Sequence, residues 1–184
     1  MPTRYFPDHT VESAPAAARR NLAATADRLG FLPVGLARQG TSPHLLDAFL
    51  KISGLFESTT LDPLSREVLI MTIAARNGCH LCVAMHTAKL TKLGADPTLI
   101  TALQEQQPLD DARLAAIQRF ILAVLAMSGA VDDATMQEFL DHGYTAQNAL
   151  EVVLGIGAYT MSTLANQLVQ APVDEQLKQF AQAG

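Results

Sequence analysis

Residues 62–93 read DPLSREVLIMTIAARNGCHLCVAMHTAKLTKL and decide the fold around them. Asp62 and the proline after it are a typical helix start, because aspartate caps free N–H groups and proline suits the first helical position. Apolar residues then recur at steps of about 3.6 until Asn77 and Gly78 interrupt them. The stretch predicts two helices joined by a short turn, with the second helix beginning at Cys79 and capped by Asn77.

The same signals recur along the rest of the chain. Alanine-rich composition predicts a helix over 13–29 that ends at Gly30, whereas residues 30–41 are turn-like. Nowhere do β-branched and polar residues alternate between hairpin turns. We therefore expect an all-α fold of about eight helices. The remaining predicted caps are Ser42, for a helix to about Phe56, then Asp96, Asp110, Asp132 and Thr145.

The length of 184 residues suits one domain with its own core. Residues 1–12 contain two prolines and predict an irregular N-terminal arm, so the single all-α domain is expected over 13–184. Hydrophobic residues make up 49% of the chain, which indicates apolar surface covered by partner subunits. We therefore expect a homo-oligomer.

Charge and cysteine content narrow the class of protein. With 13 Lys and Arg against 18 Asp and Glu, no basic excess is available for a phosphate backbone, and we expect no nucleic-acid partner. The N-terminus does not resemble a secretory signal, which predicts a cytoplasmic protein, where close cysteine pairs are more often catalytic or metal-binding than structural. Residues 152–170 lack charge, but their apolar runs are too short for a bilayer, so they predict a buried helix and no membrane partner.

Both cysteines of the chain lie at the start of the second predicted helix. Positions i, i+3 and i+7 share one helix face, so Cys79, Cys82 and His86 point the same way. Free N–H groups in a first helical turn favour an anionic thiolate. The pattern predicts a reversible dithiol, with His86 close enough to exchange a proton with Cys82.

Glu67 lies among apolar neighbours on the preceding helix. A buried, unpaired carboxylate costs several kcal/mol, so Glu67 needs a proton or a partner. His86, on the adjacent antiparallel helix, is a candidate partner. The series Glu67, His86, Cys82 would be an arrangement that activates a nucleophile.

Other interpretations of these residues remain open. The cysteines are also compatible with a structural disulfide, or with a zinc site that includes His86 and Glu67. Glu67 taken alone fits a solvated first-turn carboxylate, and His86 a hydrogen-bonded core residue. Haem attachment is excluded, because Val83 rather than histidine follows the second cysteine.

Three further polar residues are auxiliary candidates. His80, between the cysteines, would raise thiolate character through its charge. Tyr159 and Asn166 lie seven residues apart on one helix face, as pocket residues or inter-subunit contacts.

Four candidate residues have a distinctive spacing: eleven residues separate Glu67 from Cys79, two separate Cys79 from Cys82, and three separate Cys82 from His86. This spacing resembles the signature of the alkylhydroperoxidase D-like proteins of the carboxymuconolactone decarboxylase superfamily. The resemblance extends to LGFLPVGL at 29–36, SPHLLDAFL at 42–50 and the stretch at 141–168, which look like the peroxidase-related branch. One position departs from the best-known members, because Leu81 replaces a histidine directly before the second cysteine.

This resemblance implies an all-helical trimer or hexamer with thiol peroxidase activity. It implies a peroxidatic Cys82, a resolving Cys79 and a proton relay through His86 backed by Glu67. A hydroperoxide would be the substrate. No cofactor or metal is implied, and the reductant would be an external dithiol protein or a lipoyl-type carrier.

Two other functions use the same residues. The first is a muconolactone-type decarboxylase, which needs a proton donor rather than a dithiol. The second is a redox sensor, in which the disulfide changes an interface without turnover.

Overall fold

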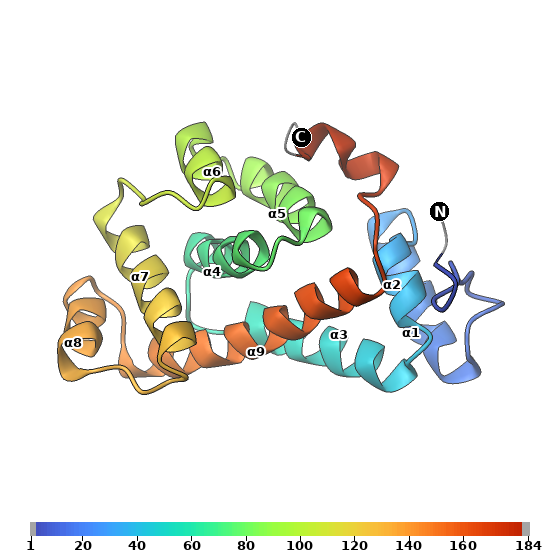
Figure 1. Cartoon of the computed structure of the whole chain (residues 1–184), viewed down its shortest axis with the longest axis horizontal. Coiled ribbons are helices and arrows are strands. Elements are labelled where there is room, and N and C mark those ends of the chain that lie inside the picture. Colours follow the sequence, from blue (N-terminus) through green and yellow to red (C-terminus); the bar gives the residue numbers. More distant parts are fainter. Residues whose placement is uncertain (1–2, 182–184) are drawn as a thin grey trace.

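The computed structural model describes residues 3–181, and within that range the regular secondary structure is entirely helical (Figure 1). The all-α prediction is confirmed, and eight of the nine α-helices have eight residues or more. Residues 3–12 form neither helix nor strand, and residues 1–2 and 182–184 lie outside the described range. The helices are α1 (Ala16–Leu29), α2 (Val34–Gln39), α3 (Pro43–Glu57), α4 (Pro63–Arg76), α5 (His80–Lys92), α6 (Pro97–Gln104), α7 (Ala112–Ala126), α8 (Asp133–Asp141), α9 (Ala146–Leu168) and the 3-10 helix η1 (Glu175–Phe180).

Helix α4 is the centre of the packing. It contacts α5, α6, α7 and α9, and residues 67–75 of it are all buried. In Figure 1 the long helix α9 runs beneath α4, with α3 alongside it, α8 near one end and α2 near the other. The main hydrophobic core includes Val68 and Ile73 of α4, Ile117 of α7 and Val152 of α9. The dithiol helix α5 therefore packs against the buried central helix α4.

Side-chain caps explain most helix starts. The predicted caps Ser42, Asp62 and Asp96 accept backbone N–H groups, as do Asp132 and Thr145. Helix α7 is an exception, because Asp111 and not the predicted Asp110 accepts from the Leu114 N–H. Either aspartate is chemically suitable, so the helix register decides between them.

Two local predictions are wrong. The turn-like segment 30–41 contains the short helix α2, which begins after Pro33. Asn77 does not cap α5: Cys79 occupies the N-cap position, and the Asn77 amide instead donates to Thr163 Oγ1 on α9 at 2.8 Å. The Asn77 side chain makes a tertiary hydrogen bond in place of the local capping bond that the sequence predicted.

The prediction of a buried helix at 152–170 is only half right. Helix α9 buries one side against α3 and α4, but Val153, Leu164 and Leu168 are more than half exposed. Within residues 3–181, no helix is both long and apolar enough to cross a membrane.

Candidate active site

The α4–α5 hairpin positions the dithiol. Gly78 adopts a φ of +64°, a left-handed conformation that residues with a Cβ rarely take, and this lets the chain reverse within the three residues between α4 and α5. Gln167 of α9 donates to the Asn77 and Gly78 carbonyl oxygens at 2.9 and 2.7 Å. The turn that presents Cys79 is therefore fixed by α9 as well as by its own sequence.

Both cysteines are free thiols and both are buried, with exposures of 3% for Cys79 and 7% for Cys82. Hydrogen bonding with Cys82 lowers the pKa of Cys79 below that of an ordinary thiol, although burial opposes the shift. The same hydrogen bond, together with burial, raises the pKa of Cys82. The two sulfurs thus titrate as a pair, in which one thiolate is stabilised by the other thiol.

The expected contact between Glu67 and His86 is present. His86 Nδ1 lies 2.7 Å from Glu67 Oε2, and Glu67 is only 1% exposed. With Nδ1–H donating to the carboxylate, the Nε2 lone pair of His86 is left to accept a proton. The Tyr159 ring packs at 89° to the His86 ring with centroids 5.7 Å apart, which holds the imidazole in place. Within residues 3–181, no hydrogen bond joins His86 to either sulfur.

The sequence interpretation missed Lys89. Its Nζ lies 2.8 Å from Glu67 Oε1 and also pairs with Glu57. Burial would raise the pKa of Glu67, but the charges and hydrogen bonds of His86 and Lys89 outweigh it, so the pKa is lowered. Burial likewise opposes the charge of Lys89, yet its bonds to Glu57 and Glu67 raise its pKa. The buried carboxylate is therefore ionised between two partners.

Asn166, left open in the sequence interpretation as a pocket or interface residue, contacts the dithiol directly. Its Nδ2 donates to Cys82 Sγ at 3.3 Å, and its Oδ1 accepts from Gln39 Nε2 at 2.8 Å. Gln39 lies in α2, the helix that the sequence did not predict. The site thus draws residues from α2, α4, α5 and α9.

His80 is not brought into this cluster. Its side chain is exposed and makes no hydrogen bond or ion pair with any residue of 3–181. The zinc interpretation also lacks support, because no group of three His, Cys, Asp or Glu side chains within the described range is arranged to hold a metal ion.

A cavity of about 630 Å³ opens beside the relay. His86 and Tyr159 line one side, and apolar side chains such as Phe49, Met85 and Leu177 line much of the rest. Neither cysteine lines the cavity, but His86 follows Cys82 by one helical turn of α5.

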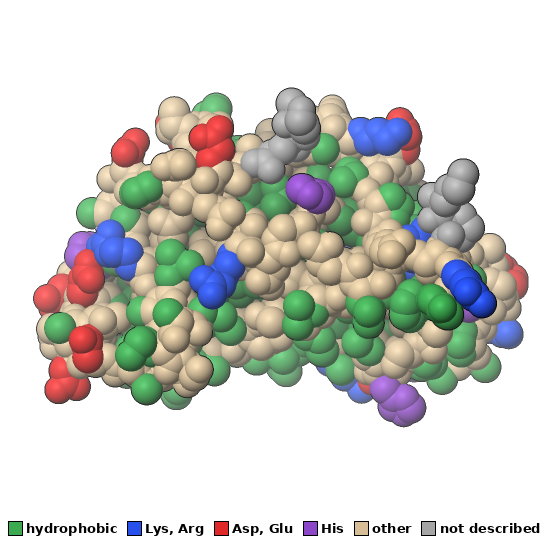
Figure 2. Space-filling model, viewed as in Figure 1, with side chains coloured by type: hydrophobic (Ala, Val, Ile, Leu, Met, Phe, Trp, Pro, Cys, Tyr) green, Lys and Arg blue, Asp and Glu red, His purple; other side chains and the backbone are tan. Residues whose placement is uncertain are grey.

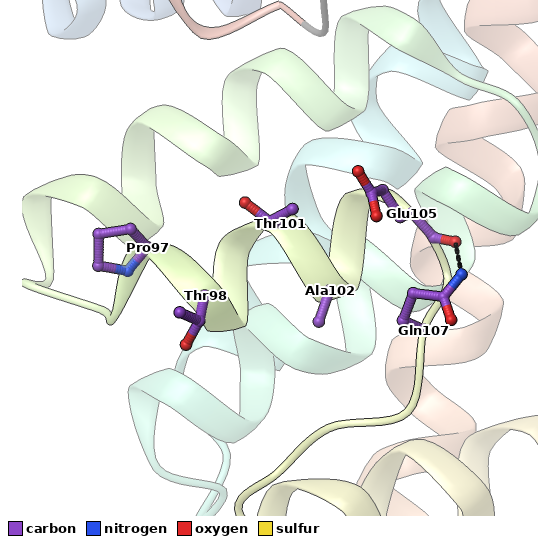
Figure 3. Close-up of a pocket in the computed structure, with 6 residues that line it drawn as sticks. All are labelled: Pro97, Thr98, Thr101, Ala102, Glu105 and Gln107. Carbon is purple, nitrogen blue, oxygen red and sulfur yellow. Dashed lines mark hydrogen bonds between the residues drawn. The ribbon is translucent and has the colours of Figure 1, made fainter.

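The hollow along α6 in Figure 3 is a separate feature. Its volume is about 380 Å³, and Pro97, Thr98, Thr101, Ala102, Glu105 and Gln107 line it. Glu105 is its only ionisable side chain, and none of the dithiol or relay residues reaches it, so it is not a candidate active site.

Comparison with solved structures supports the fold. The chain is similar to an uncharacterized peroxidase-related protein from Ralstonia eutropha JMP134 with an alkylhydroperoxidase AhpD core (TM-score 0.81, 20% identity, 94% of this chain and 93% of that one). It is also similar to an uncharacterized peroxidase-related protein from Silicibacter sp. TM1040 (TM-score 0.79, 20% identity, 97% of each chain). A third match is the debrominase Bmp8 in complex with 2,3,4-tribromopyrrole (TM-score 0.74, 20% identity, 98% and 96%). Among curated protein sequences, none matches significantly.

The family model adds a sequence-level match. The Carboxymuconolactone decarboxylase family model matches residues 43–120, which include α3 and the complete α4–α5 hairpin. Residues 43–120 are therefore similar to the carboxymuconolactone decarboxylase family, and the chain has an AhpD-like helical fold, in agreement with the resemblance found in the sequence.

Proposed function

We propose that this protein is a dithiol-dependent peroxidase that reduces organic hydroperoxides. The observation that carries the proposal is the pair of free, buried thiols Cys79 and Cys82 at the start of α5, where Cys82 precedes His86, the ion-pair partner of Glu67, by about one helical turn. A thiolate next to a second thiol and a positioned imidazole has the groups that peroxide reduction needs.

In the first step the Cys82 thiolate attacks the terminal oxygen of the hydroperoxide. An S–O bond forms, the O–O bond breaks, and the leaving alkoxide takes a proton from His86 to become the alcohol. Glu67 stabilises the imidazolium that supplies this proton. Cys82 becomes a sulfenic acid, oxidised by the two electrons that the peroxide accepts.

In the second step the Cys79 thiolate attacks the sulfenic sulfur. The S–S bond forms, hydroxide leaves, and with one proton it becomes water. An external dithiol, either a small protein or a lipoyl-type carrier, then reduces the Cys79–Cys82 disulfide through a mixed disulfide. Each turnover converts one hydroperoxide and one dithiol into an alcohol, water and an oxidised carrier.

The cavity beside His86 favours organic hydroperoxides over hydrogen peroxide. Its walls are largely apolar, and its volume suits a drug-sized molecule. Arg28 and Lys92 also line it, both exposed and both without a hydrogen bond or ion pair within residues 3–181. These cations favour substrates that carry an acidic group away from the peroxide.

The proposed assembly is a trimer or hexamer with α9 at an interface between copies. Leu150, Val153, Leu164 and Leu168 lie within about 60° of one another around α9 and are 51–74% exposed. Figure 2 shows hydrophobic side chains along the lower edge of the molecule, where α3 and α9 lie. Exposed apolar side chains at both ends of one face of α9 suit burial against a second copy.

Steady-state consumption of a hydroperoxide with excess dithiol tests the function. We expect sustained turnover in wild type and none in Cys82→Ser, with cumene hydroperoxide turned over faster than hydrogen peroxide. Cys79→Ser is the matched comparison, because it should form the sulfenic acid once and then stop.

Two other outcomes point to the other functions. One equivalent of peroxide consumed without turnover would identify a redox sensor. Full turnover of a muconolactone-type acid after both cysteines are alkylated would identify a decarboxylase.

A further inference from the structure

We infer that Asn166, held in orientation by Gln39, is a catalytic residue that places the negative charge of the dithiol on Cys82 rather than on Cys79. This assignment goes beyond the proposed function, and it rests on that function only for its consequence, the choice of the sulfur that attacks peroxide.

The first observation is the contact itself. Asn166 Nδ2 lies 3.3 Å from Cys82 Sγ, and an amide nitrogen donates hydrogen bonds but never accepts them. Asn166 is 9% exposed, so little water competes for the sulfur. A buried donor stabilises an anionic acceptor more than a neutral one, so this bond strengthens when Cys82 loses its proton.

The second observation fixes which end of the Asn166 amide faces the sulfur. Gln39 Nε2 donates to Asn166 Oδ1 at 2.8 Å, which turns the NH₂ group toward Cys82. Within residues 3–181, Gln39 Oε1 is buried without a hydrogen-bond partner, so the bond to Asn166 is made by the donor end of the Gln39 amide.

Gly35 provides the space that this arrangement needs. A Cβ at this position would lie 2.6 Å from Asn166 Oδ1 and 3.0 Å from the Leu81 side chain. Any larger residue would displace the amide from the sulfur. Helix α2 therefore supports Asn166 at two positions, Gly35 and Gln39.

The dithiol needs a selecting group because its two sulfurs are not equivalent. Hydrogen bonding between them lowers the pKa of Cys79 and raises that of Cys82, whereas hydrogen bonding to Asn166 lowers the pKa of both thiols. Moving one proton from Cys82 to Cys79 places the negative charge on Cys82 without changing the number of protons that the dithiol holds. The hydrogen bond from Asn166 Nδ2 is made to Cys82 Sγ, so this contact favours that transfer.

Partial alkylation tests the assignment without any peroxide. The reduced protein is treated with substoichiometric iodoacetamide at neutral pH, and label on each cysteine is measured by fragmentation of the tryptic peptide 77–89, which contains both. We expect Cys82 to carry most of the label in wild type. Asn166→Leu should lower the Cys82 to Cys79 ratio about tenfold, because a hydrogen bond to a charged group is lost.

Two further substitutions separate this role from simple packing. Asn166→Asp keeps the shape but replaces the donor with a carboxylate, so the ratio should also fall. In Gln39→Glu the new carboxylate accepts from Asn166 Nδ2, which turns Asn166 Oδ1 toward Cys82. This variant should lower the Cys82 to Cys79 label ratio more than Gln39→Leu does. Gln118→Leu is the control, since Gln118 is also a buried glutamine that donates to a carbonyl oxygen, but outside this site.

The outcomes distinguish this inference from the proposed function. An unchanged or increased ratio in Asn166→Leu and Asn166→Asp would overturn the role of Asn166, even if the wild type turns over hydroperoxide. A lowered ratio in both would support it, even if the wild type shows no peroxidase activity at all.

Discussion

Lys89 Nζ lies 2.8 Å from Glu67 Oε1, and His86 Nδ1 lies 2.7 Å from the other oxygen of the same carboxylate. One buried carboxylate thus connects the relay histidine to a lysine whose side chain is 39% exposed. A proton relay of this kind requires Glu67 to be ionised, and the lysine supplies the compensating charge.

Replacing Lys89 with methionine should therefore weaken both the relay and the fold. The pKa of Glu67 should rise when the ammonium is removed, and peroxide turnover should fall about tenfold. The free energy of unfolding should decrease by about 1 kcal/mol, because Lys89 is partly solvated. Urea unfolding and steady-state kinetics measure the two effects.

Lys51→Met is the control for the lysine substitution, because Lys51 pairs with Asp47 on the surface and with no other side chain of residues 3–181. It should change neither quantity measurably. Equal effects in the two variants would show that Lys89 has no special connection to Glu67.

The pKa of Glu67 also predicts a pH dependence of stability. Its pKa is lowered in the folded protein, so its ionisation contributes stability that is complete above the unfolded value of about 4.3 and is lost as the pH falls through the folded value. Glu67→Gln should therefore be less stable than wild type by about 2 kcal/mol at pH 7. Urea unfolding from pH 7 to pH 3 should show the two proteins converging at acid pH, and a difference that widens there would contradict the ionised carboxylate.

Gly155 should be a sensitive packing position in α9. A Cβ there would lie 2.5 Å from Phe56 Cε2 and 2.8 Å from Leu69 Cδ2, so α9 would have to move away from α3 and α4. We expect Gly155→Ala to lower the free energy of unfolding by about 1–3 kcal/mol in thermal or urea unfolding.

Gly54→Ala is the matched control for Gly155. Among the described residues, no atom beyond the helix's own backbone and chain neighbours lies within 4 Å of a Cβ at Gly54 in α3, so alanine should stabilise the helix by about 0.5–1 kcal/mol. If both variants were destabilised equally, the close approach at Gly155 would not be the cause.

Charge on the exposed stripe of α9 should disrupt the expected assembly. Leu164→Glu and Leu168→Glu each introduce a carboxylate at a position where the leucine side chain is at least 58% exposed in the single chain. Light scattering after size-exclusion chromatography should show the wild type as a trimer or hexamer and the double variant at a lower mass, with the same helical circular dichroism. Met127→Glu, at the end of α7, should leave the mass unchanged, and a monomeric wild type would refute the assembly.

Local signals in the sequence predicted much of the fold. Capping side chains followed by proline mark α3, α4 and α6, because these interactions occur within one turn of chain. Helix α2 was missed, since its six residues are too few for a periodic pattern and its position depends on contacts with α3 and α9.

The candidate active site also combines contacts that local sequence predicts with contacts that depend on tertiary packing. Glu67 and His86 are close because consecutive antiparallel helices must face each other, so their pairing was predictable. Lys89 carried an available signal, since it follows His86 by three residues and shares its helix face. Asn166 lies 84 residues from its partner Cys82, and Gln39 lies 127 residues from its partner Asn166. Only tertiary packing brings these side chains together.

Helix α9 contributes four successive contacts to the dithiol region. Tyr159 packs on His86, Thr163 accepts from Asn77, Asn166 donates to Cys82, and Gln167 binds the turn carbonyls. Each residue of an α-helix is rotated by about 100° from the one before it, so these side chains share a face only while the residue count between them is kept. Point substitutions on the opposite face of α9 leave this alignment intact, whereas deleting a single residue between Tyr159 and Thr163 would rotate Asn166 and Gln167 out of phase with Tyr159.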